Sequence, residues 1–218
     1  MRSFAIIGLS SFGHYLAKYL SEMGHRVMAI DKDQERIERV KQFVDRAVIA
    51  DATDKETLDS LGLGELDIIV VSLGDQIDAS ILVTLYLREL KVNQIIAKAL
   101  TEDHGKVLDI VGATRVIFPE RDEAHRLATT MESDYLIDTI PLGDGMSIIE
   151  IATPEKFVGK SLGDLDLRNK YGVLVLVVKE LVPDKVVMIP TATQVLKDSD
   201  ILLILGKDED LGKIKKMK

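Results

Sequence analysis

The sequence predicts an α/β protein in which a doubly wound, parallel six-stranded sheet is followed by a smaller α+β domain. Three observations support this prediction. Six short apolar segments alternate with helical segments over about the first 118 residues, with no hairpin signal between them. A glycine-containing turn joins the first apolar segment to the first helical one. Near residue 137 the pattern changes to short strands and turns, so we place two domains at 1–137 and 138–218.

The six apolar segments are the expected strands of the first domain, and capping residues mark the helices between them. Asp33 and Thr101 precede helical segments as N-caps, and Thr53 forms a capping box with Glu56. The fourth strand is apolar throughout, which is typical of a strand covered on both faces. This is the Rossmann-like order, which places a ligand at the carboxyl ends of the strands. The expected strands are FAIIG, RVMAID, RAVIAD, LDIIVVSL, QIIAKAL and RVIFP.

The second domain shows short strands separated by turns. A helical segment, ERDEAHRLATTMESDYLI, follows the sixth strand, and DTIPLGDG is expected to be a linker because it holds a proline and two glycines. The expected strands beyond it are SIIEIATP, VLVLVV, KVVMIP and DILLIL, with one or two short helices among them. This pattern predicts an α+β domain of about 80 residues.

Composition excludes several classes of function. The chain contains no cysteine, which excludes disulfides, thiol nucleophiles and cysteine-based metal sites. Its 36 acidic and 28 basic side chains give a net charge of −8, so no nucleic-acid partner is expected. The apolar runs are far shorter than the roughly 18 residues of a membrane-spanning helix. The N-terminus has no signal-peptide pattern, so we expect a soluble, cytoplasmic protein.

The turn at residues 8–13 is a variant of the dinucleotide fingerprint G-x-G-x-x-G, with serine at the middle glycine. It follows a strand and opens a helix in the first βαβ unit, where helix N–H groups attract a pyrophosphate. Serine at position 10 narrows the approach of a phosphate without closing it, and its hydroxyl can donate to that phosphate. The context therefore favours a nucleotide site over a merely structural turn. The residues are Gly8, Leu9, Ser10, Ser11, Phe12 and Gly13.

Polar residues at the ends of three further strands extend the predicted site. Asp31 ends the second strand about 20 residues after the turn, where an acidic residue hydrogen-bonds ribose hydroxyls and disfavours the 2′-phosphate of NADP. Its alternative role is to start a loop. Asp51 and Thr53 follow the third strand and can meet the adenine edge; the alternative is helix capping by Thr53 or Asp54, and both roles can hold at once. A small-residue turn after the fourth strand leaves room for phosphate. With neighbours, the set is Asp31, Lys32, Asp51, Ala52, Thr53, Ser72, Leu73 and Gly74.

Two charged residues lie at the ends of the last two strands. Lys98 occupies an apolar strand, where it either reaches a phosphate or pairs with a neighbouring acid. Glu120 follows Pro119 and is either a helix N-terminal acid favoured by the dipole or a ligand of a nucleotide-bound metal ion. Both alternatives stay open for both residues. The four histidines lack metal-ligand spacing, and no nucleophile elbow, Walker lysine or HExxH motif is present, so no catalytic residue is predicted.

Several motifs combine along the chain. The first domain contains FAIIGLSSFG, AID, ADATD, IIVVSLGD, IIAKA and VIFPE, and the second contains FVGKSLGDLDLRNKYGVLVLVV and VLKDSDILLILG. In this combination the sequence resembles the cytoplasmic regulators of potassium conductance, the RCK or TrkA family. More narrowly, it resembles the regulatory subunits of Ktr/Trk-type potassium transporters. The resemblance covers essentially the whole chain and depends on the combination rather than on any single motif.

The resemblance implies a nucleotide-sensing regulator rather than an enzyme. It implies homodimers that assemble into a ring, expected to be an octamer, beneath a membrane-embedded potassium-translocating subunit. The chain would then lie at the inner face of the cell membrane through its partner. In some members the second domain binds cyclic di-AMP, for which Arg168, Asn169 and Tyr171 are loose candidates. The first domain would bind ATP, ADP, AMP or NAD(H) through Gly8, Ser10, Gly13, Asp31, Asp51 and Thr53, with Glu120 near the nucleotide and able to bind Mg²⁺ or Ca²⁺.

The turn departs from the family pattern at its centre. Many relatives read G-L-G-R-F-G, whereas this chain has Ser10 and Ser11 at the second glycine and the arginine. Loss of that arginine removes a cation from the phosphate end, so strong discrimination between ATP and ADP is not expected. Two other functions stay open: an NAD-dependent oxidoreductase, and a nucleotide sensor with a non-transport partner. Hydride exchange with a substrate would indicate the first, whereas a neighbouring gene for a potassium-translocating membrane subunit would favour the transport role over both.

Overall fold

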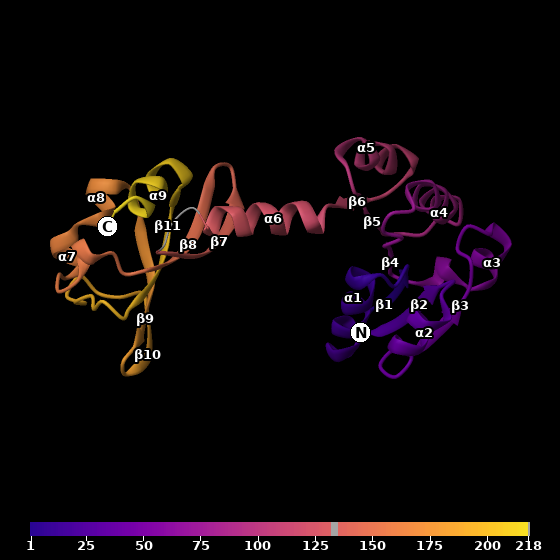
Figure 1. Ribbon diagram of the computed structural model, residues 1–218, viewed down its shortest axis with the longest axis horizontal. Coiled ribbons are helices and arrows are strands. Elements are labelled where there is room, and N and C mark those ends of the chain that lie inside the picture. The colour runs from indigo at the N-terminus through magenta and orange to yellow at the C-terminus, as the bar shows by residue number, and fades with distance from the viewer. Residues whose placement is uncertain (132–134, 218) are drawn as a thin grey trace. The chain divides into compact units, whose positions relative to one another are not determined.

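Two sheets, one parallel and one antiparallel, organise the chain (Figure 1). The computed structural model describes residues 1–131 and 135–217. By the distribution of its internal contacts the chain separates into unit 1, Met1–Pro119, and unit 2, Glu120–Lys218. The functional division at 137/138 stays a prediction. Among the residues that the structure describes, no helix is long and apolar enough to cross a membrane.

The sheet of unit 1 is parallel throughout, in the order β3-β2-β1-β4-β5-β6, which confirms the predicted fold class. The order reverses between β1 and β4, and a ligand site is expected at such a switch point. Ile7 ends β1 there, between Ile30 of β2 and Val71 of β4. The strands are β1 Ser3–Ile7, β2 Arg26–Asp31, β3 Arg46–Ile49, β4 Ile68–Val71, β5 Ile95–Lys98 and β6 Arg115–Ile117.

Helices cover both faces of this sheet, which explains its continuously apolar central strands. Every residue of β1 and β4 is buried. Along β1, Ala5 and Ile7 belong to a core cluster under α3, α4 and α5, whereas Phe4 and Ile6 belong to one under α1 and α2. The helices are α1 Ser11–Glu22, α2 Gln34–Val40, α3 Lys55–Ser60, α4 Ile77–Glu89 and α5 Glu102–Val111, with the 3₁₀ turn η1 Leu63–Glu65.

The helix starts of unit 1 confirm two predicted caps and correct a third. Asp33 and Thr101 cap α2 and α5, as predicted. The capping box at Thr53 is wrong, because the carboxylate of Asp54 caps α3 instead. The hydroxyl of Thr53 donates to Asp51 at 2.7 Å and is therefore engaged elsewhere.

Unit 2 contains an antiparallel sheet in the order β10-β9-β11-β8-β7, and the four predicted strands are present in it. Its core joins Ile149 and Ile151 of β8 to Leu202 and Ile204 of β11. The strands are β7 Leu136–Gly143, β8 Met146–Ala152, β9 Leu174–Leu181, β10 Asp184–Met188 and β11 Ile201–Lys207. The helices are α6 Pro119–Thr130, α7 Leu162–Leu165, α8 Leu167–Tyr171 and α9 Asp208–Lys215, with the 3₁₀ turn η2 Glu155–Phe157.

The predicted linker DTIPLGDG is wrong, because most of it belongs to β7. Asp144 and Gly145, with φ values of 52° and 68°, form the turn that joins β7 to β8 as a hairpin. Proline is tolerated in β7 because this strand lies at a sheet edge. The preceding helix ends at Thr130, so the predicted helix is too long at its end, of which residues 132–134 lie outside the described residues. Three short α-helices follow β8, rather than the one or two expected.

Candidate functional site

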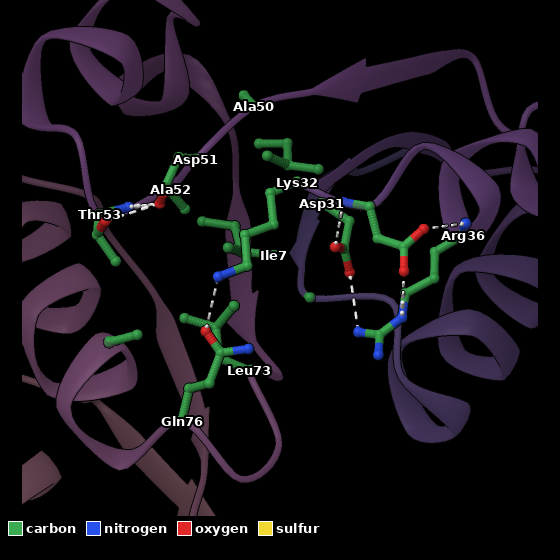
Figure 2. Close-up of a pocket in the computed structure, with 14 residues that line it drawn as sticks. Ile7, Asp31, Lys32, Arg36, Ala50, Asp51, Ala52, Thr53, Leu73 and Gln76 are labelled. Atoms are coloured by element: carbon green, nitrogen blue, oxygen red, sulfur yellow. Dashed lines mark hydrogen bonds and ion pairs between the residues drawn. The ribbon is translucent and has the colours of Figure 1, made fainter.

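A pocket lies at the carboxyl ends of β1, β2 and β3, beside the switch point (Figure 2). Its lining combines the glycine turn with polar residues that follow neighbouring strands. Part of the predicted site is therefore brought together in space from segments far apart in the sequence. The predicted residues that line it are Gly8, Asp31, Lys32, Asp51, Ala52, Thr53 and Leu73, joined by Ile7, Ile30, Asp33, Arg36, Ala50, Gln76 and Ala79.

The other predicted residues lie beside the pocket or outside its lining. Residues 9–13 continue from the glycine turn into α1, and Ser72 and Gly74 flank Leu73 after β4. Lys98 ends β5, and Glu120 is exposed in the first turn of α6; neither lines the pocket. The structure thus gathers the residues expected around adenosine and the turn, but not the two outlying charges.

The glycines of the turn are required by close backbone contacts. Gly8 has φ +91°, and a Cβ built on it would lie 2.4 Å from the carbonyl oxygen of Ser72. A Cβ on Gly13 would lie 2.0 Å from the carbonyl oxygen of Gly8. Only glycine lets α1 start this close to the ends of β1 and β4. The same closeness brings the N-terminus of α1 to the edge of the pocket, where its N–H groups favour an anion.

Two buried hydroxyl groups beside this turn lack hydrogen-bond partners among the described residues, the Oγ atoms of Ser10 and Ser72. Ser72 is fully buried. Ser10 is the N-cap of α1, yet its side chain makes no capping hydrogen bond. A buried hydroxyl without a partner is costly, so its retention needs a reason. Both hydroxyls suit the oxygens of a phosphate, as does the narrow glycine turn that a Cβ would fill.

Asp31 holds the glycine turn in place. One carboxylate oxygen accepts from the backbone N–H of Leu9 at 2.7 Å, and the other accepts from that of Asp33 at 2.9 Å. The residue is 7% exposed. A carboxylate offers about four lone-pair positions, so these two bonds leave capacity for ribose hydroxyls. Asp31 is thus a structural tie as well as the predicted ribose partner, a role that stays a prediction.

Asp51 and Thr53 form a compact polar turn on another wall of the pocket. The hydroxyl and the backbone N–H of Thr53 donate to one Asp51 oxygen at 2.7 and 2.9 Å. These two hydrogen bonds, with a smaller contribution from the positive charge of Lys32, hold the pKa of the Asp51 carboxyl below its ordinary value. Asp51 therefore stays ionised at neutral pH. It can accept a hydrogen bond from an adenine amino group, whereas the Thr53 hydroxyl is already committed as a donor.

Among the pocket residues that were not predicted from the sequence, Arg36 and Gln76 contact the charged side chains of the lining. An Arg36 guanidinium nitrogen lies 3.5 Å from Asp31 Oδ2, and Nε lies 3.6 Å from Asp33 Oδ2. Gln76 Oε1 accepts from Lys32 Nζ at 3.3 Å (Figure 2). The i, i+3 interval from the N-cap Asp33 to Arg36 is a sequence signal for their ion pair, but it does not place Arg36 in a pocket.

Lys98 is 7% exposed, and its ammonium group lies 6.0 Å from the ring centroid of Phe12 in the first turn of α1. This contact brings the charge close to the glycine turn without placing it in the pocket. Among the described residues, no group of three or more His, Asp or Glu side chains is arranged to hold a metal ion. A metal role for Glu120 stays a prediction.

In unit 2, Arg168 borders two surface hollows. One also contains Lys207, so two cations and the apolar Val173 and Leu174 line it. Of the other residues considered with Arg168, the Asn169 amide donates to Asp166 at 2.7 Å, and Tyr171 packs against the core.

Comparison with solved structures agrees with this fold. The crystal structure of the GsuK RCK domain aligns with the whole chain at a TM-score of 0.69 and 20% identity, although the chain spans 48% of that protein. The GsuK channel bound to NAD aligns at a TM-score of 0.68 and 20% identity over 39% of its length. At these identities the likeness concerns the fold alone.

Sequence comparison assigns the family. Residues 4–119 match the model of the TrkA-N domain, and residues 146–218 match that of the TrkA-C domain. The chain is 39% identical to Ktr system potassium uptake protein C of Bacillus subtilis (strain 168), over 99% of this chain and 96% of that protein. It is 36% identical to Ktr system potassium uptake protein A of the same organism, over 96% and 94%. The chain therefore belongs to the TrkA-N/TrkA-C family, together with the Ktr system potassium uptake proteins.

Proposed function

We propose that this chain is a cytoplasmic, nucleotide-sensing regulatory subunit of a potassium uptake system. The observation that carries the nucleotide assignment is the pair of buried hydroxyls without partners, Ser10 and Ser72, at the N-terminus of α1 beside the pocket. The transport assignment is supported by the relatives, which are named Ktr system potassium uptake proteins. No catalytic role is assigned to any residue.

In this proposal the phosphates of the nucleotide lie against the glycine turn. The first N–H groups of α1 and the hydroxyls of Ser10 and Ser72 donate to phosphate oxygens, which gives both hydroxyls the partners they lack. The adenosine part extends into the pocket, where Asp31 accepts from ribose hydroxyls and Asp51 accepts from the adenine amino group. A side chain at position 8 would clash with the carbonyl oxygen of Ser72, so the phosphate site is shaped by the backbone of the turn.

The phosphate end favours a nucleotide with few terminal charges. Ser11 is exposed and uncharged at the position where similar proteins carry arginine. Lys98 supplies the nearby positive charge, beyond the ring of Phe12. We therefore propose AMP, ADP or NAD(H) as better ligands than ATP. The NAD-bound GsuK channel shares this fold, which supports including a dinucleotide.

Ligand binding can change the shape of unit 1 because the pocket joins both halves of the sheet. Asp31 ties the end of β2 to the glycine turn, and Lys32 contacts Gln76, the N-cap of α4. A nucleotide that bridges these segments alters the spacing of α1 and α4. We propose that homodimers assemble into a ring, with an octamer as the working model, and that this change is passed to a membrane-embedded potassium-translocating subunit. The chain would thus be peripheral to the inner membrane face.

Two finer assignments belong to the same proposal. Glu120 binds Mg²⁺ or Ca²⁺ next to the nucleotide of an assembled dimer, where a second subunit completes the ligand set. In unit 2, the surface around Arg168 and Lys207 binds cyclic di-AMP, because its cations suit phosphates and Val173 and Leu174 suit the bases. Loss of cyclic di-AMP binding in Arg168→Gln, with adenine-nucleotide binding unchanged, is the expected result; unchanged cyclic di-AMP affinity would contradict the assignment.

The ligand is tested by mass spectrometry of what co-purifies and by calorimetric titration of the full chain with AMP, ADP, ATP and NAD(H). We expect binding of adenine nucleotides, with guanine nucleotides as the control for base selectivity. Failure of every adenine nucleotide to bind would overturn the nucleotide assignment. Hydride exchange between bound NAD(H) and a substrate would instead favour the oxidoreductase alternative.

The transport role is tested in liposomes that contain a potassium-translocating membrane subunit of a Ktr system. We expect potassium flux to depend on the added chain and on the nucleotide bound to it. Light scattering of the chain alone, with and without nucleotide, measures the assembly. A monomer under both conditions would contradict the ring model. Potassium flux that does not depend on the added chain would contradict the transport role and favour a nucleotide sensor with a different partner.

A further inference from the structure

We infer that Arg36 is a specificity-determining residue that lets the pocket accept an adenine nucleotide carrying a phosphate on the ribose 2′ oxygen. The sequence alone places Asp31 at this position and predicts that such a phosphate is repelled. The structure adds a cation that this prediction did not include. The inference rests on the proposed function, because it takes the pocket to hold adenosine.

The position of Arg36 is the first observation. It lies in the first turn of α2, lines the pocket, and places its guanidinium beside Asp31 (Figure 2). The same guanidinium also lies beside Asp33. Asp31 ends β2 at the position where dinucleotide sites bind the ribose. In such sites an acidic side chain hydrogen-bonds a free 2′ hydroxyl, whereas a nearby arginine accommodates a 2′-phosphate. This pocket contains both groups side by side.

The charge of the lining is the second observation. Three carboxylates, from Asp31, Asp33 and Asp51, face two cations, from Lys32 and Arg36. Lys32 contacts Gln76 and acts on Asp51, on the adenine side, so Arg36 is the cation paired with Asp31 and Asp33. Without Arg36, a ribose phosphate would meet two carboxylates with no adjacent positive charge.

The third observation is that the Arg36 side chain can move, whereas the Asp31 side chain is held in place. The Asp31 side chain is 6% exposed and tied to two backbone N–H groups, so it cannot turn away from a ligand. The Arg36 side chain is 42% exposed, and its contacts at 3.5 and 3.6 Å are at the outer limit of hydrogen bonding. Arg36 is therefore able to turn toward a phosphate, whose oxygens match the planar guanidinium fork.

The test compares two ligands that differ only in the 2′-phosphate, 5′-AMP and adenosine 2′,5′-bisphosphate, by calorimetric titration of the full chain. For the unaltered protein we expect the two Kd values to lie within about tenfold of each other, because the positive charge of Arg36 offsets the repulsion between Asp31 and the 2′-phosphate. In Arg36→Gln the Kd of the bisphosphate should be at least about tenfold higher than in the unaltered protein, whereas the Kd of 5′-AMP should change by less than about threefold. Arg36→Lys keeps the charge but loses the fork, and should be intermediate.

Arg39→Gln is the matched control. Arg39 lies on the same helix, its side chain is 68% exposed, it pairs with Glu35 at 3.6 Å, and it does not line the pocket. We expect it to leave both Kd values unchanged. Comparing two ligands on each variant cancels any general loss of folded protein, and Arg36→Lys keeps the comparison available should Arg36→Gln be poorly folded.

The outcomes separate the two levels of inference. If 5′-AMP binds and the ratio of the two Kd values is the same in Arg36→Gln or Arg36→Lys as in the unaltered chain, the role of Arg36 is wrong while the proposed function stands. If the unaltered chain binds the bisphosphate more than about tenfold more weakly than 5′-AMP, the role of Arg36 is likewise wrong, because the negative charge of Asp31 would then dominate. If neither ligand binds the unaltered chain, the adenosine pocket itself is wrong.

Discussion

At the contact between α4 and α5, the buried side chains of Ser80 and His104 are hydrogen-bonded to each other, whereas at the glycine turn two buried hydroxyls have no partner among the described residues. His104 accepts from the backbone N–H of Leu100 at 3.3 Å through Nδ1 and contacts the Ser80 hydroxyl at 2.8 Å through Nε2. That hydroxyl donates to the carbonyl of Ile77, so a neutral His104 with its proton on Nε2 completes the network.

The difference between these regions separates groups that stabilise the fold from groups that, under the proposed function, are retained for a ligand. A buried hydroxyl without a partner costs about 1–3 kcal/mol, whereas a bonded one contributes about 1 kcal/mol. The Ser80–His104 pair therefore holds two helices together. Under the proposed function, the Ser10 and Ser72 hydroxyls reduce stability until a polar ligand reaches them. Four predictions test this comparison, from the largest expected effect to the smallest.

Gly8→Ala should have the largest effect, because its Cβ would lie 2.4 Å from the Ser72 carbonyl oxygen in a backbone with φ +91°. We expect a loss of about 3 kcal/mol in the free energy of unfolding, measured by urea denaturation, with loss of nucleotide binding. Gly24→Ala is the control, since Gly24 has φ +81° but open space around it. It should cost about 1 kcal/mol. Equal losses would show that the close contact is not what requires Gly8.

Asp31→Ala should come next, because it leaves the backbone N–H groups of Leu9 and Asp33 without their acceptor. We expect a loss of about 2 kcal/mol in the free energy of unfolding and weaker adenosine binding. Asp54→Ala removes an exposed cap outside the pocket, and should cost about 1 kcal/mol without changing binding. If Asp31→Ala impairs binding but not stability, its tie to the glycine turn is energetically unimportant.

The serine pair tests the comparison directly. Ser80→Ala should lower the free energy of unfolding by about 1–2 kcal/mol, because it leaves a buried His104 nitrogen unpartnered. Ser72→Ala should change stability by less than about 0.5 kcal/mol or increase it, because no described partner is lost. The Ser72 variant should instead bind phosphate-bearing nucleotides more weakly. A stability loss as large as that of Ser80→Ala, with unchanged binding, would remove the distinction between the two regions.

The smallest expected effect is a pH dependence. Burial holds the pKa of His104 below its ordinary value of 6.5, so between these two pKa values the unfolded chain binds more protons than the folded one. The contribution of neutral His104 is complete above pH 6.5 and decreases as the pH falls toward the folded-state pKa. Denaturation curves between pH 7.5 and about 5.5 should show this slope, and His104→Gln should reduce it. His125→Gln, at an exposed position on α6, is the control that should retain the slope.

The parallel sheet was predictable because its signals are local. Apolar runs such as IIVV, the glycine at position 8 and the acid at position 31 each have a strong preference for one structure. The strand β7 was missed because a proline and two glycines are typical of loops, and only its place at a sheet edge makes them acceptable. The Asp144-Gly145 turn was the hairpin signal that the sequence contained.

The candidate site likewise contains residues that were predictable from the sequence and residues that were not. The glycine turn, Asp31 and the Asp51–Thr53 turn were identifiable from their positions after strands. Arg36 and Gln76 were not, because their role depends on which face of a helix and which neighbouring loop meet in space. Lys98 and Glu120 were grouped with the site by sequence, but the folded unit places neither in the pocket lining.

The sequence by itself determined the order of strands and helices and the glycine turn between the first strand and the first helix, because these depend on residues close together in the chain. Only the tertiary structure decided which buried polar groups have partners. Ser80 meets His104 across 24 positions, while Ser10 and Ser72 lie at the same turn without bonding. Hydrogen bonding acts over about 3 Å, so only packing decides which buried hydroxyls find a partner within the fold.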